Sequence, residues 1–217
     1  MVKNEARNLP RSLASIRGAW DELIVVDTGS TDATKEIAAS FGAHVLDVPW
    51  CDDFSTPRNA ALEQARGDWI LFLDADESFE KSKDLRAQLD GLMQESVDAW
   101  LLPLKNVEEG SAGTAAGNVQ YLLRLIRNRA DLRYRGRIHE NIVRRDAELV
   151  WKYAPQELLL LHTGYASHIS REKAERNIRI LLQEAKREGD AVTYSAYLAD
   201  AYHGLGEYER TKYYAML

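Results

Sequence analysis

The N-terminal part of the chain alternates between strand patterns and helix patterns, and this alternation constrains the fold more than any other feature. Apolar, β-branched runs at 22–27, 43–48 and 68–73 have the length of strands, and helical patterns at 33–41 and 56–66 lie between them. A helix between two strands returns the chain to the same end of a sheet, so the two strands run parallel. The sequence therefore predicts an α/β domain built on a parallel sheet.

The middle of the chain has a different rhythm, in which strand patterns follow one another with fewer helices. It contains one helix pattern at 81–95 and a loop at 109–117 that is rich in glycine and alanine. Strands are expected at 98–107, 119–127, 132–143 and 158–162. We expect these later strands to extend the sheet antiparallel or to flank it, which would make the sheet mixed.

The C-terminal part reads as helical. Residues 170–188 form a long amphipathic pattern, and the stretch TYSAYLADAYHGLGEYERTKYYAM predicts two further helices. This stretch resembles the first half of a tetratricopeptide repeat, a unit that buries its apolar face only against neighbouring repeats. We expect either the start of a longer repeat array or an amphipathic cap on the main domain. The boundaries are placed at 1–168 for the main domain and 169–217 for a helical extension that could contact a protein partner.

Composition excludes several classes of protein. The 217 residues are 45% hydrophobic and 29% charged, as in ordinary globular chains. A formal net charge of -6 provides no global basic field for nucleic acid. No apolar stretch approaches the ~20 residues of a membrane span, and the N-terminus lacks an apolar signal core. Cys51 has no cysteine partner in the sequence, which suits a reducing compartment, so we expect a cytoplasmic location.

Acidic residues follow two of the apolar runs. Asp27 ends the run IVV, and Asp74, Asp76 and Glu77 follow the run LFL. Ligands of parallel α/β sheets bind beyond the carboxyl ends of the strands. Adjacent carboxylates repel, so a metal ion, a basic side chain or water must compensate them. We favour a hard cation, Mg²⁺ or Mn²⁺, that carries a nucleoside diphosphate; the alternative is a solvated strand end with a helix-capping role.

Four segments occur together in an order that is more specific than any one of them: MVKNEARNLPRSLASI, ELIVVDTGSTDATKEIAASFGA, DDFSTPRNAALEQARGDWILFLDADE and RGRIHENI. This succession resembles the family 2 glycosyltransferases of GT-A fold. Within them it is most similar to the bacterial branch of lipooligosaccharide glucosyltransferases and bacteriocin S-glycosyltransferases. The resemblance implies a Rossmann-like mixed sheet sandwiched by helices, and a nucleotide-sugar donor.

The resemblance also implies roles for individual residues around the donor. Asp27, in the V-D-x-G-S-x-D motif, corresponds to the acid that binds the nucleotide base, and Asp74 to the acid that reaches the ribose. The loop before the helix at 56–66 supplies an acid and an arginine near the nucleotide. Here they correspond to Asp52 or Asp53 and to Arg58.

Further residues are assigned to the nucleotide and to the metal. Asn4 and Glu5 follow the strand that opens the nucleotide site in similar enzymes, although Glu5 could equally be an acid at a helix N-terminus. Asp76 corresponds to the metal-binding acid. His162 ends a predicted strand and could be a second metal ligand, since imidazole binds Mn²⁺ readily; the alternative is a structural histidine.

An inverting transfer needs a general base beside the acceptor. In the segment RIHENI, the resemblance places the pair His139 and Glu140 on the acceptor side, and we assign Glu140 as the base. The alternative is an acid that pairs with Arg135 or Arg137. If Glu140 is not the base, Glu77 is the next candidate.

These features predict an inverting, metal-dependent glycosyltransferase that moves a sugar from a nucleotide-diphosphate donor, with a UDP-sugar expected. The acceptor would be a hydroxyl or thiol on a glycan, a lipid-linked saccharide or a peptide. A sugar nucleotidyltransferase would need a glycine-rich phosphate loop, and none lies between Met1 and Leu23. A non-catalytic interaction protein built on a degenerate transferase domain is the other alternative. Since the acids lie in the first half of the chain, we expect donor binding to survive removal of 193–217.

The sequence departs from the family pattern at the first strand. In the family this strand usually has several apolar residues before the V-K-N-E motif and lies centrally in the sheet, whereas here only Met1 and Val2 stand in its place. Loss of a central strand would leave unpaired backbone groups on its neighbours. We therefore expect either a piece of a longer chain or a very short first strand.

Overall fold

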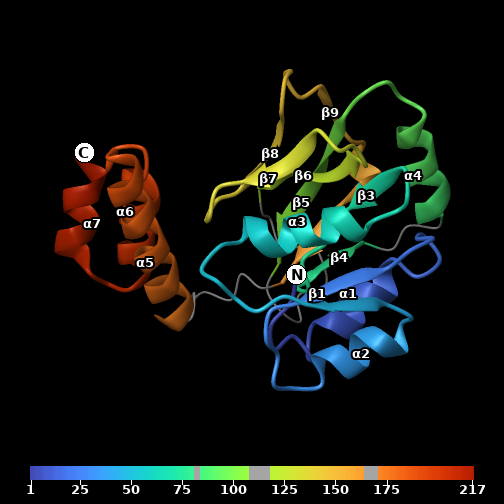
Figure 1. The fold of residues 1–217 in the computed structure, drawn as a ribbon, viewed down its shortest axis with the longest axis horizontal. Helices are drawn as coiled ribbons and strands as arrows, with labels where there is room; N and C mark the ends of the chain where they lie inside the picture. The colour runs from blue at the N-terminus through green and yellow to red at the C-terminus, as the bar shows by residue number, and fades with distance from the viewer. Residues whose placement is uncertain (81–83, 108–117, 164–170) are drawn as a thin grey trace.

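The computed structural model of the protein describes residues 1–80, 84–107, 118–163 and 171–217. An α/β body is joined by a group of three helices that stands beside it (Figure 1). The expected boundary between 168 and 169 and the expected loop at 109–117 lie outside the described residues.

The N-terminal alternation of strands and helices is confirmed, with elements slightly shorter than predicted. The elements are α1 (Leu9–Ser15), β1 (Ile24–Asp27), α2 (Thr34–Ser40), β2 (His44–Asp47), α3 (Ser55–Gln64) and β3 (Trp69–Leu71). β1 and β2 pair in parallel, with Ile24 opposite His44, as the helical crossover predicts. Val25 and Val26 of β1 are buried, which explains why this run is continuously apolar.

The middle of the chain contains two strands that the sequence patterns did not reveal. The elements here are β4 (Glu77–Phe79), α4 (Leu85–Met93), β5 (Ala99–Asn106), β6 (Val119–Arg127), β7 (Leu132–Arg135), β8 (Asn141–Arg144), β9 (Trp151–Tyr153) and β10 (Leu160–His162). β4 (ESF) and β9 (WKY) were missed because neither lies in a continuous apolar run like those that mark β3 and β10. The single expected strand at 132–143 is a hairpin of β7 and β8.

The larger sheet is mixed, as expected. Its strand order is β3-β6-β5-β10-β4, and β9 also pairs with β5. β6 is antiparallel to both β3 and β5, whereas β9 and β10 run parallel to β5. The long strand β5 therefore organises the sheet, with β6 on one edge and β9 and β10 in succession on the other.

β1 and β2 form a separate sheet, and a cavity of about 1070 Å³ lies between β1 and β3. It is lined by residues of β1 and β3 together with apolar and charged residues of α1, α3 and α4. Val2 makes one parallel bridge to Asp27, so a first strand is represented by a single residue pair.

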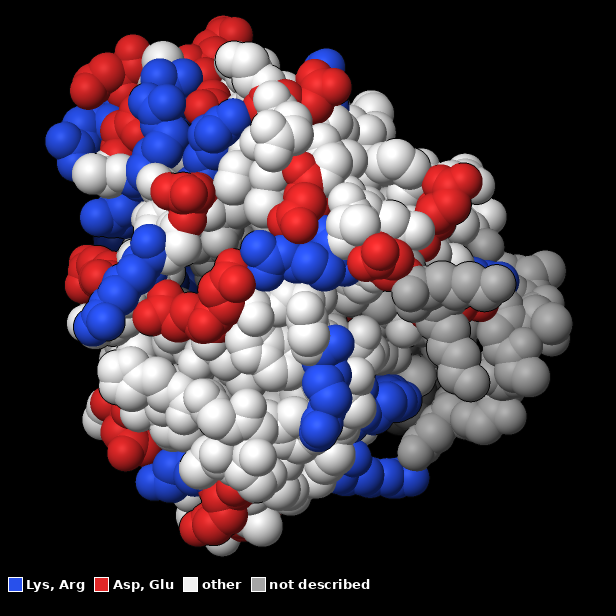
Figure 2. Space-filling model, turned by 90° about the vertical axis from the view of Figure 1, so that its right-hand side faces the viewer, with Lys and Arg blue, Asp and Glu red and all other residues white. Residues whose placement is uncertain are grey.

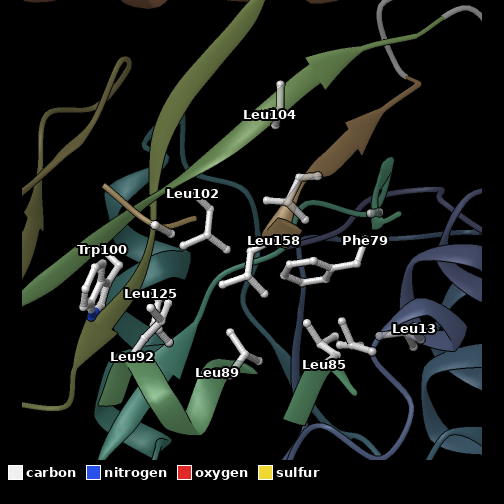
Figure 3. Close-up of a cluster of buried hydrophobic side chains, with 14 of the residues drawn as sticks. Leu13, Phe79, Leu85, Leu89, Leu92, Trp100, Leu102, Leu104, Leu125 and Leu158 are labelled. Atoms are coloured by element: carbon white, nitrogen blue, oxygen red, sulfur yellow. The ribbon is translucent and has the colours of Figure 1, made fainter. Parts of the chain in front are cut away.

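The main core lies between the larger sheet, α1 and α4 (Figure 3). Leu102 and Leu125 from the sheet are fully buried and face the α4 residues Leu85, Leu89 and Leu92, whose spacing keeps them on one side of the helix. Burial of each such leucine contributes about 1.5–3 kcal/mol relative to exposure. This packing fixes the strands that carry the acidic cluster described below.

The C-terminal helices are α5 (Arg171–Glu188), α6 (Ser195–Gly204) and α7 (Tyr208–Ala215). They pack on one another and on two loops of the body, around a core that is separate from the main one. None of the helices in the described ranges has the length and apolarity of a membrane span. On the face shown in Figure 2, basic and acidic side chains are interspersed, without a field of one sign.

Candidate active site

A chain of ion pairs links five side chains at the end of β3. Arg58 Nη2 lies 3.3 Å from Asp74 Oδ1, and Arg58 Nε donates to Glu140 Oε1 at 2.5 Å. Arg124 Nη2 donates to Asp74 Oδ2 at 2.9 Å and also to Glu77 Oε1. Two arginines therefore alternate with three carboxylates.

Arg58 is held over two aromatic rings. It projects from the first turns of α3, and its guanidinium carbon lies 5.3 Å from the ring centre of Tyr134 and 6.0 Å from that of Phe72. The two rings meet edge to face at 5.1 Å. Burial raises the pKa of Tyr134 to about 12, so the phenol stays neutral beneath the cation. The platform orients Arg58 toward Asp74 and Glu140.

Arg124 reaches the acids because β6 is irregular at this residue. Trp100 of β5 pairs with Leu125, but the next residue, Leu101, pairs with Leu123. Arg124 is thus one extra residue on β6, a β-bulge, and bulges redirect side chains next to functional sites. The sequence patterns predicted the strand but gave no sign of the bulge, so Arg124 was missed.

The two arginines, rather than a metal ion, compensate the first and last acids of the cluster. Burial alone would raise the pKa of Asp74, but the charges of Arg124 and Arg58 outweigh it and hold that pKa well below its usual value. Burial raises the pKa of Glu77, although Arg124 opposes this. The interpretation that all these acids await a cation is corrected here: Asp74 and Glu77 already have basic partners.

Asp76 has a different partner, His162. The imidazole Nε2 lies 3.2 Å from Asp76 Oδ2. The pairing of β10 with β4 sets this distance, because it places His162 opposite Glu77, and the amide of Thr163 donates to the carbonyl of Asp76. The hydrogen bond to Asp76 raises the pKa of His162 above its usual value.

The donor set at Asp76 and His162 suits a divalent cation. His162 Nδ1 lies 2.9 Å from the side-chain oxygen of Asn106, which accepts its proton and leaves Nε2 as the ring nitrogen directed at Asp76. A carboxylate oxygen and an imidazole nitrogen are ligands that Mn²⁺ accepts. Across the described ranges, no three His, Cys, Asp or Glu side chains gather as a closed metal site. A cation here would need further oxygen ligands from a bound molecule or water.

Asp27 is a buried carboxylate with one oxygen unused. Its side chain is 1% exposed, and Oδ1 accepts from the amides of Gly29 and Ser30 at 2.9 and 2.8 Å. Burial would raise the pKa of Asp27, but the hydrogen bonds from Ser30 and Gly29 lower it, so the group is ionised at neutral pH. Oδ2 has no hydrogen-bond partner within the described residues. A buried, charged acceptor of this kind requires a donor from a ligand or from water.

The first residues of the chain lie between Asp27 and the ion-pair chain. Val2 pairs with β1 beside Asp27. Met1 and Val2 line the same cavity as Arg58. Asp27 and the ion-pair chain therefore both lie near residues 1–2.

Asn4 and Glu5 are engaged in local hydrogen bonds. Asn4 Oδ1 accepts from the amide of Thr31 at 2.8 Å, which ties the N-terminal segment to the turn after β1. Glu5 Oε2 accepts from the side chain of Asn8 at 2.8 Å, at the start of α1. This contact agrees with the alternative interpretation of Glu5 as an acid at a helix N-terminus.

The loop before α3 does not bring an acid to Asp74. Asp52 Oδ1 accepts from Arg179 of α5 at 2.7 Å and from the indole of Trp50 at 2.8 Å, so it faces the helical extension. Asp53 Oδ1 accepts from the amides at the start of α3. Asp52, Asp53 and Arg58 were the residues predicted here. Among the described residues of this region, only Arg58 contacts the acidic cluster.

Glu140 joins the cluster through an unexpected partner. The sequence offered Arg135 or Arg137 as its ion-pair partner, whereas the structure pairs it with Arg58. Glu77, the substitute base, is 2% exposed and is tied to Arg124, so it cannot reach an acceptor in this conformation. A second residue missed from the sequence is Arg11, which donates to the carbonyl of Asp76 at 3.1 Å.

The mixed sheet, the acids beyond its strands and the flanking helices define the GT-A class of glycosyltransferase folds. The profile of Glycosyl transferase family 2 matches residues 1–142. The chain belongs to this family.

Relatives with known names agree with this assignment. A TPR repeat-containing protein of Synechococcus elongatus is 48% identical over 144 residues, which cover 64% of this chain and 33% of that protein. The glycosyltransferase SunS of the SPbeta prophage in Bacillus subtilis is 28% identical over 186 residues, or 83% of this chain and 42% of SunS. The chain thus spans well under half the length of these relatives.

The fold is similar to that of S. aureus TarS. The crystal structure of TarS 1-349 superimposes with a TM-score of 0.54 at 17% identity, covering 85% of this chain and 63% of that one. A longer TarS structure gives a TM-score of 0.52 and covers 93% of this chain. At this identity the likeness concerns the fold alone.

Proposed function

We propose that the protein is an inverting glycosyltransferase that takes a sugar from a uridine diphosphate donor. The observation that carries the proposal is the pairing of Asp76 with His162 beside Asp74, in a chain of family 2. This arrangement offers a carboxylate and an imidazole as metal ligands, next to Asp74, which two arginines keep ionised. SunS is called a glycosyltransferase, which is consistent with the same class of reaction.

Asp27 would bind the nucleotide base. Its unpaired Oδ2 needs a donor, and the ring N–H of uracil supplies one. Asp74 would accept a hydrogen bond from a ribose hydroxyl, in place of part of its contact with Arg58. Asn4 and Glu5 would shape the nucleotide pocket through the backbone near Asp27, whereas the role assigned to Asp52 has no support from its contact with Arg179.

Asp76 and His162 would hold Mn²⁺ or Mg²⁺. When bound, the cation would neutralise charge on the departing diphosphate. His162 is suited to this because Asn106 fixes its ring orientation. Arg11, which contacts the Asp76 carbonyl, would hold the backbone of this segment in place.

Glu140 would act as the general base. It would accept the proton of an acceptor hydroxyl or thiol as that atom attacks the anomeric carbon and the bond to the diphosphate oxygen breaks. Arg58 holds Oε1 at 2.5 Å and so orients the carboxylate, which leaves Oε2 to take the proton. The acceptor would be a glycan, a lipid-linked saccharide or a peptide.

The helical extension from 171 onward would be the start of a tetratricopeptide-like array and would contact a protein partner. The name of the Synechococcus relative supports this proposal. A non-catalytic role for the whole chain is disfavoured by the ionised acids at the site.

The proposal is tested by a thermal-shift panel of nucleoside diphosphates and nucleotide-sugars, with and without Mn²⁺, followed by assay of free diphosphate release. A ligand that binds the folded state raises its apparent stability by mass action. We expect UDP or a UDP-sugar with Mn²⁺ to give the largest shift, and the parent protein to release UDP from that donor. No shift with any nucleotide and no release would refute the proposed function.

A further inference from the structure

Glu140 lies on a tight loop between β7 and β8 whose conformation needs outside support. Gly136 has φ 101° and His139 has φ 53°, both in the left-handed region. A Cβ atom at Gly136 would lie 3.4 Å from the Cα atom of Glu140, so position 136 suits glycine, which has no Cβ atom. Histidine adopts this backbone unfavourably, and such residues persist where their surroundings hold them. The backbone immediately before Glu140 therefore depends on contacts outside its own loop.

Those contacts come from the C-terminal helices. The ring of His139 stacks on the ring of Tyr197 in α6, with centroids 3.7 Å apart and planes 15° apart. The neighbouring Ile138 is 7% exposed and belongs to the core cluster of the extension. The buried members of that cluster from the helices are Ile178, Ile180, Leu181, Leu198 and Tyr202.

The same helices hold the loop before α3. Asp52 has φ 57°, another left-handed residue that is not glycine, and its carboxylate pairs with Arg179 of α5 at 2.7 Å. The guanidinium of Arg176 lies over the rings of Phe54 and Trp50, at 5.0 and 5.6 Å. In Figure 1 this loop and the β7–β8 loop both project toward α5 and α6.

The two loops are also bonded to each other. The amide of Phe54 donates to the carbonyl of Arg137 at 2.9 Å, and Arg137 Nε donates to the carbonyl of Asp52 at 3.2 Å. The hydroxyl of Ser55 donates to the carbonyl of Gly136 at 2.5 Å. One helical unit therefore covers two loops that hydrogen-bond to each other.

We propose that α5 and α6 position the catalytic pair Arg58 and Glu140, and that Tyr197 is a positioning residue for Glu140. Arg58 lies in α3, just after the loop that contains Asp52. Glu140 is the last residue of the loop between β7 and β8. The stack of Tyr197 on His139 fixes the peptide that precedes Glu140 and thereby the direction of its carboxylate. The inference rests on the proposed role of Glu140 and replaces the expectation that the extension is independent of the site.

Tyr197 allows a clean test because it lies at the edge of the extension. It is 43% exposed, so truncation leaves no closed cavity. Tyr197→Ala removes the stack, whereas Tyr197→Phe keeps the ring and removes the hydroxyl. Tyr208→Ala is the matched control, since Tyr208 lies on α7, is 69% exposed and contacts His203 rather than either loop.

The experiment measures UDP release from UDP-glucose, UDP-galactose and UDP-N-acetylglucosamine with Mn²⁺, using the donor that the parent turns over fastest. Small misplacement of a reacting group can cost about a hundredfold in rate. We expect Tyr197→Ala to lower kcat by about tenfold to a hundredfold with the donor KM nearly unchanged. Tyr197→Phe and Tyr208→Ala should keep the parental kcat.

Hydrogen exchange of the amides at 137–141 gives a second readout that needs no activity. We expect faster exchange in Tyr197→Ala and parental exchange in the other two variants. Parental kcat in Tyr197→Ala, or unchanged exchange at these amides, would overturn the inference. If the parent itself releases no UDP from any donor, the proposed function fails, and the exchange result alone decides whether Tyr197 holds the loop.

Discussion

The carboxylate of Asp76 and the imidazole of His162 lie 3.2 Å apart, although the first follows β3 and the second ends β10. The pairing of β4 with β10 brings them together, and Asn106 on β5 orients the ring. The contact joins the two residues that the sequence assigned to a metal, each on separate grounds. It remains a prediction that a metal binds there.

Asp76→Asn should keep the fold and weaken Mn²⁺-dependent binding of UDP. The change removes one negative charge from the proposed cation site, and we expect the affinity to fall by at least about tenfold. Isothermal titration with UDP, in the presence and absence of Mn²⁺, measures the effect. Asp146→Asn, at an exposed position, is the control. Equal Mn²⁺-dependent affinity in Asp76→Asn and the parent would remove Asp76 from the metal site.

Binding of Mn²⁺ should increase with pH above the usual titration range of histidine. The hydrogen bond to Asp76 raises the pKa of His162, so without metal the ring stays protonated to a pH above 6.5. A protonated imidazole cannot bind a cation, so the Mn²⁺-dependent affinity for UDP should rise with pH and level off once the ring is neutral.

The His162→Gln variant should show a weaker and flatter pH profile. In the metal-free parent, the free energy of unfolding should depend on pH in the opposite direction. The His162–Asp76 ion pair contributes its full stability below the pKa that His162 has in the unfolded chain, and this contribution is lost as pH rises through the raised pKa of the folded state. Identical binding profiles in the parent and in His162→Gln would contradict the assignment of His162.

Glu140→Gln should reduce transfer while leaving donor binding nearly normal. The amide preserves the shape and a hydrogen-bonding oxygen but cannot accept the proton, so we expect a loss of about a hundredfold to ten-thousandfold in rate on a hydroxyl acceptor. A thiol acceptor should be less affected, since a thiol is partly ionised near neutral pH. Rates with a matched acceptor and donor affinities are measured in parallel, with Glu148→Gln as an exposed control. Full activity on a hydroxyl acceptor would eliminate Glu140 as the base.

Arg124→Met should be strongly destabilising. Arg124 is the basic partner of Glu77, whose side chain is 2% exposed, and loss of one member of a buried ion pair typically costs about 3–5 kcal/mol. Urea unfolding measures the change, with Arg145→Met as an exposed control expected within about 0.5 kcal/mol of the parent. Adding Glu77→Met should recover part of the loss, because the buried charge is then removed as well. A loss below about 1 kcal/mol for Arg124→Met would show that the pair does not hold the site together.

The sequence by itself determined the N-terminal alternation of strands and helices and the position of the acids along it. Continuous apolar runs mark the strands β1 and β3, and the acids that follow these runs lie at or just beyond the strand ends: Asp27 ends β1, and Asp74 and Asp76 lie between β3 and β4. Local patterns carry this information because the period of a strand or helix is written in neighbouring residues.

Only the tertiary structure decided the partners of these acids. Arg124 reaches Asp74 through a bulge, Arg58 reaches Glu140 from α3, and Asp52 pairs with Arg179 of α5 rather than joining the acidic cluster. Such pairings depend on strand register and on the packing of segments distant in sequence, and a shift of one residue moves a side chain to the other face of a strand. The contact between His139 in the Glu140 loop and Tyr197 of α6 also depends on tertiary packing, because no sequence pattern near His139 points to Tyr197.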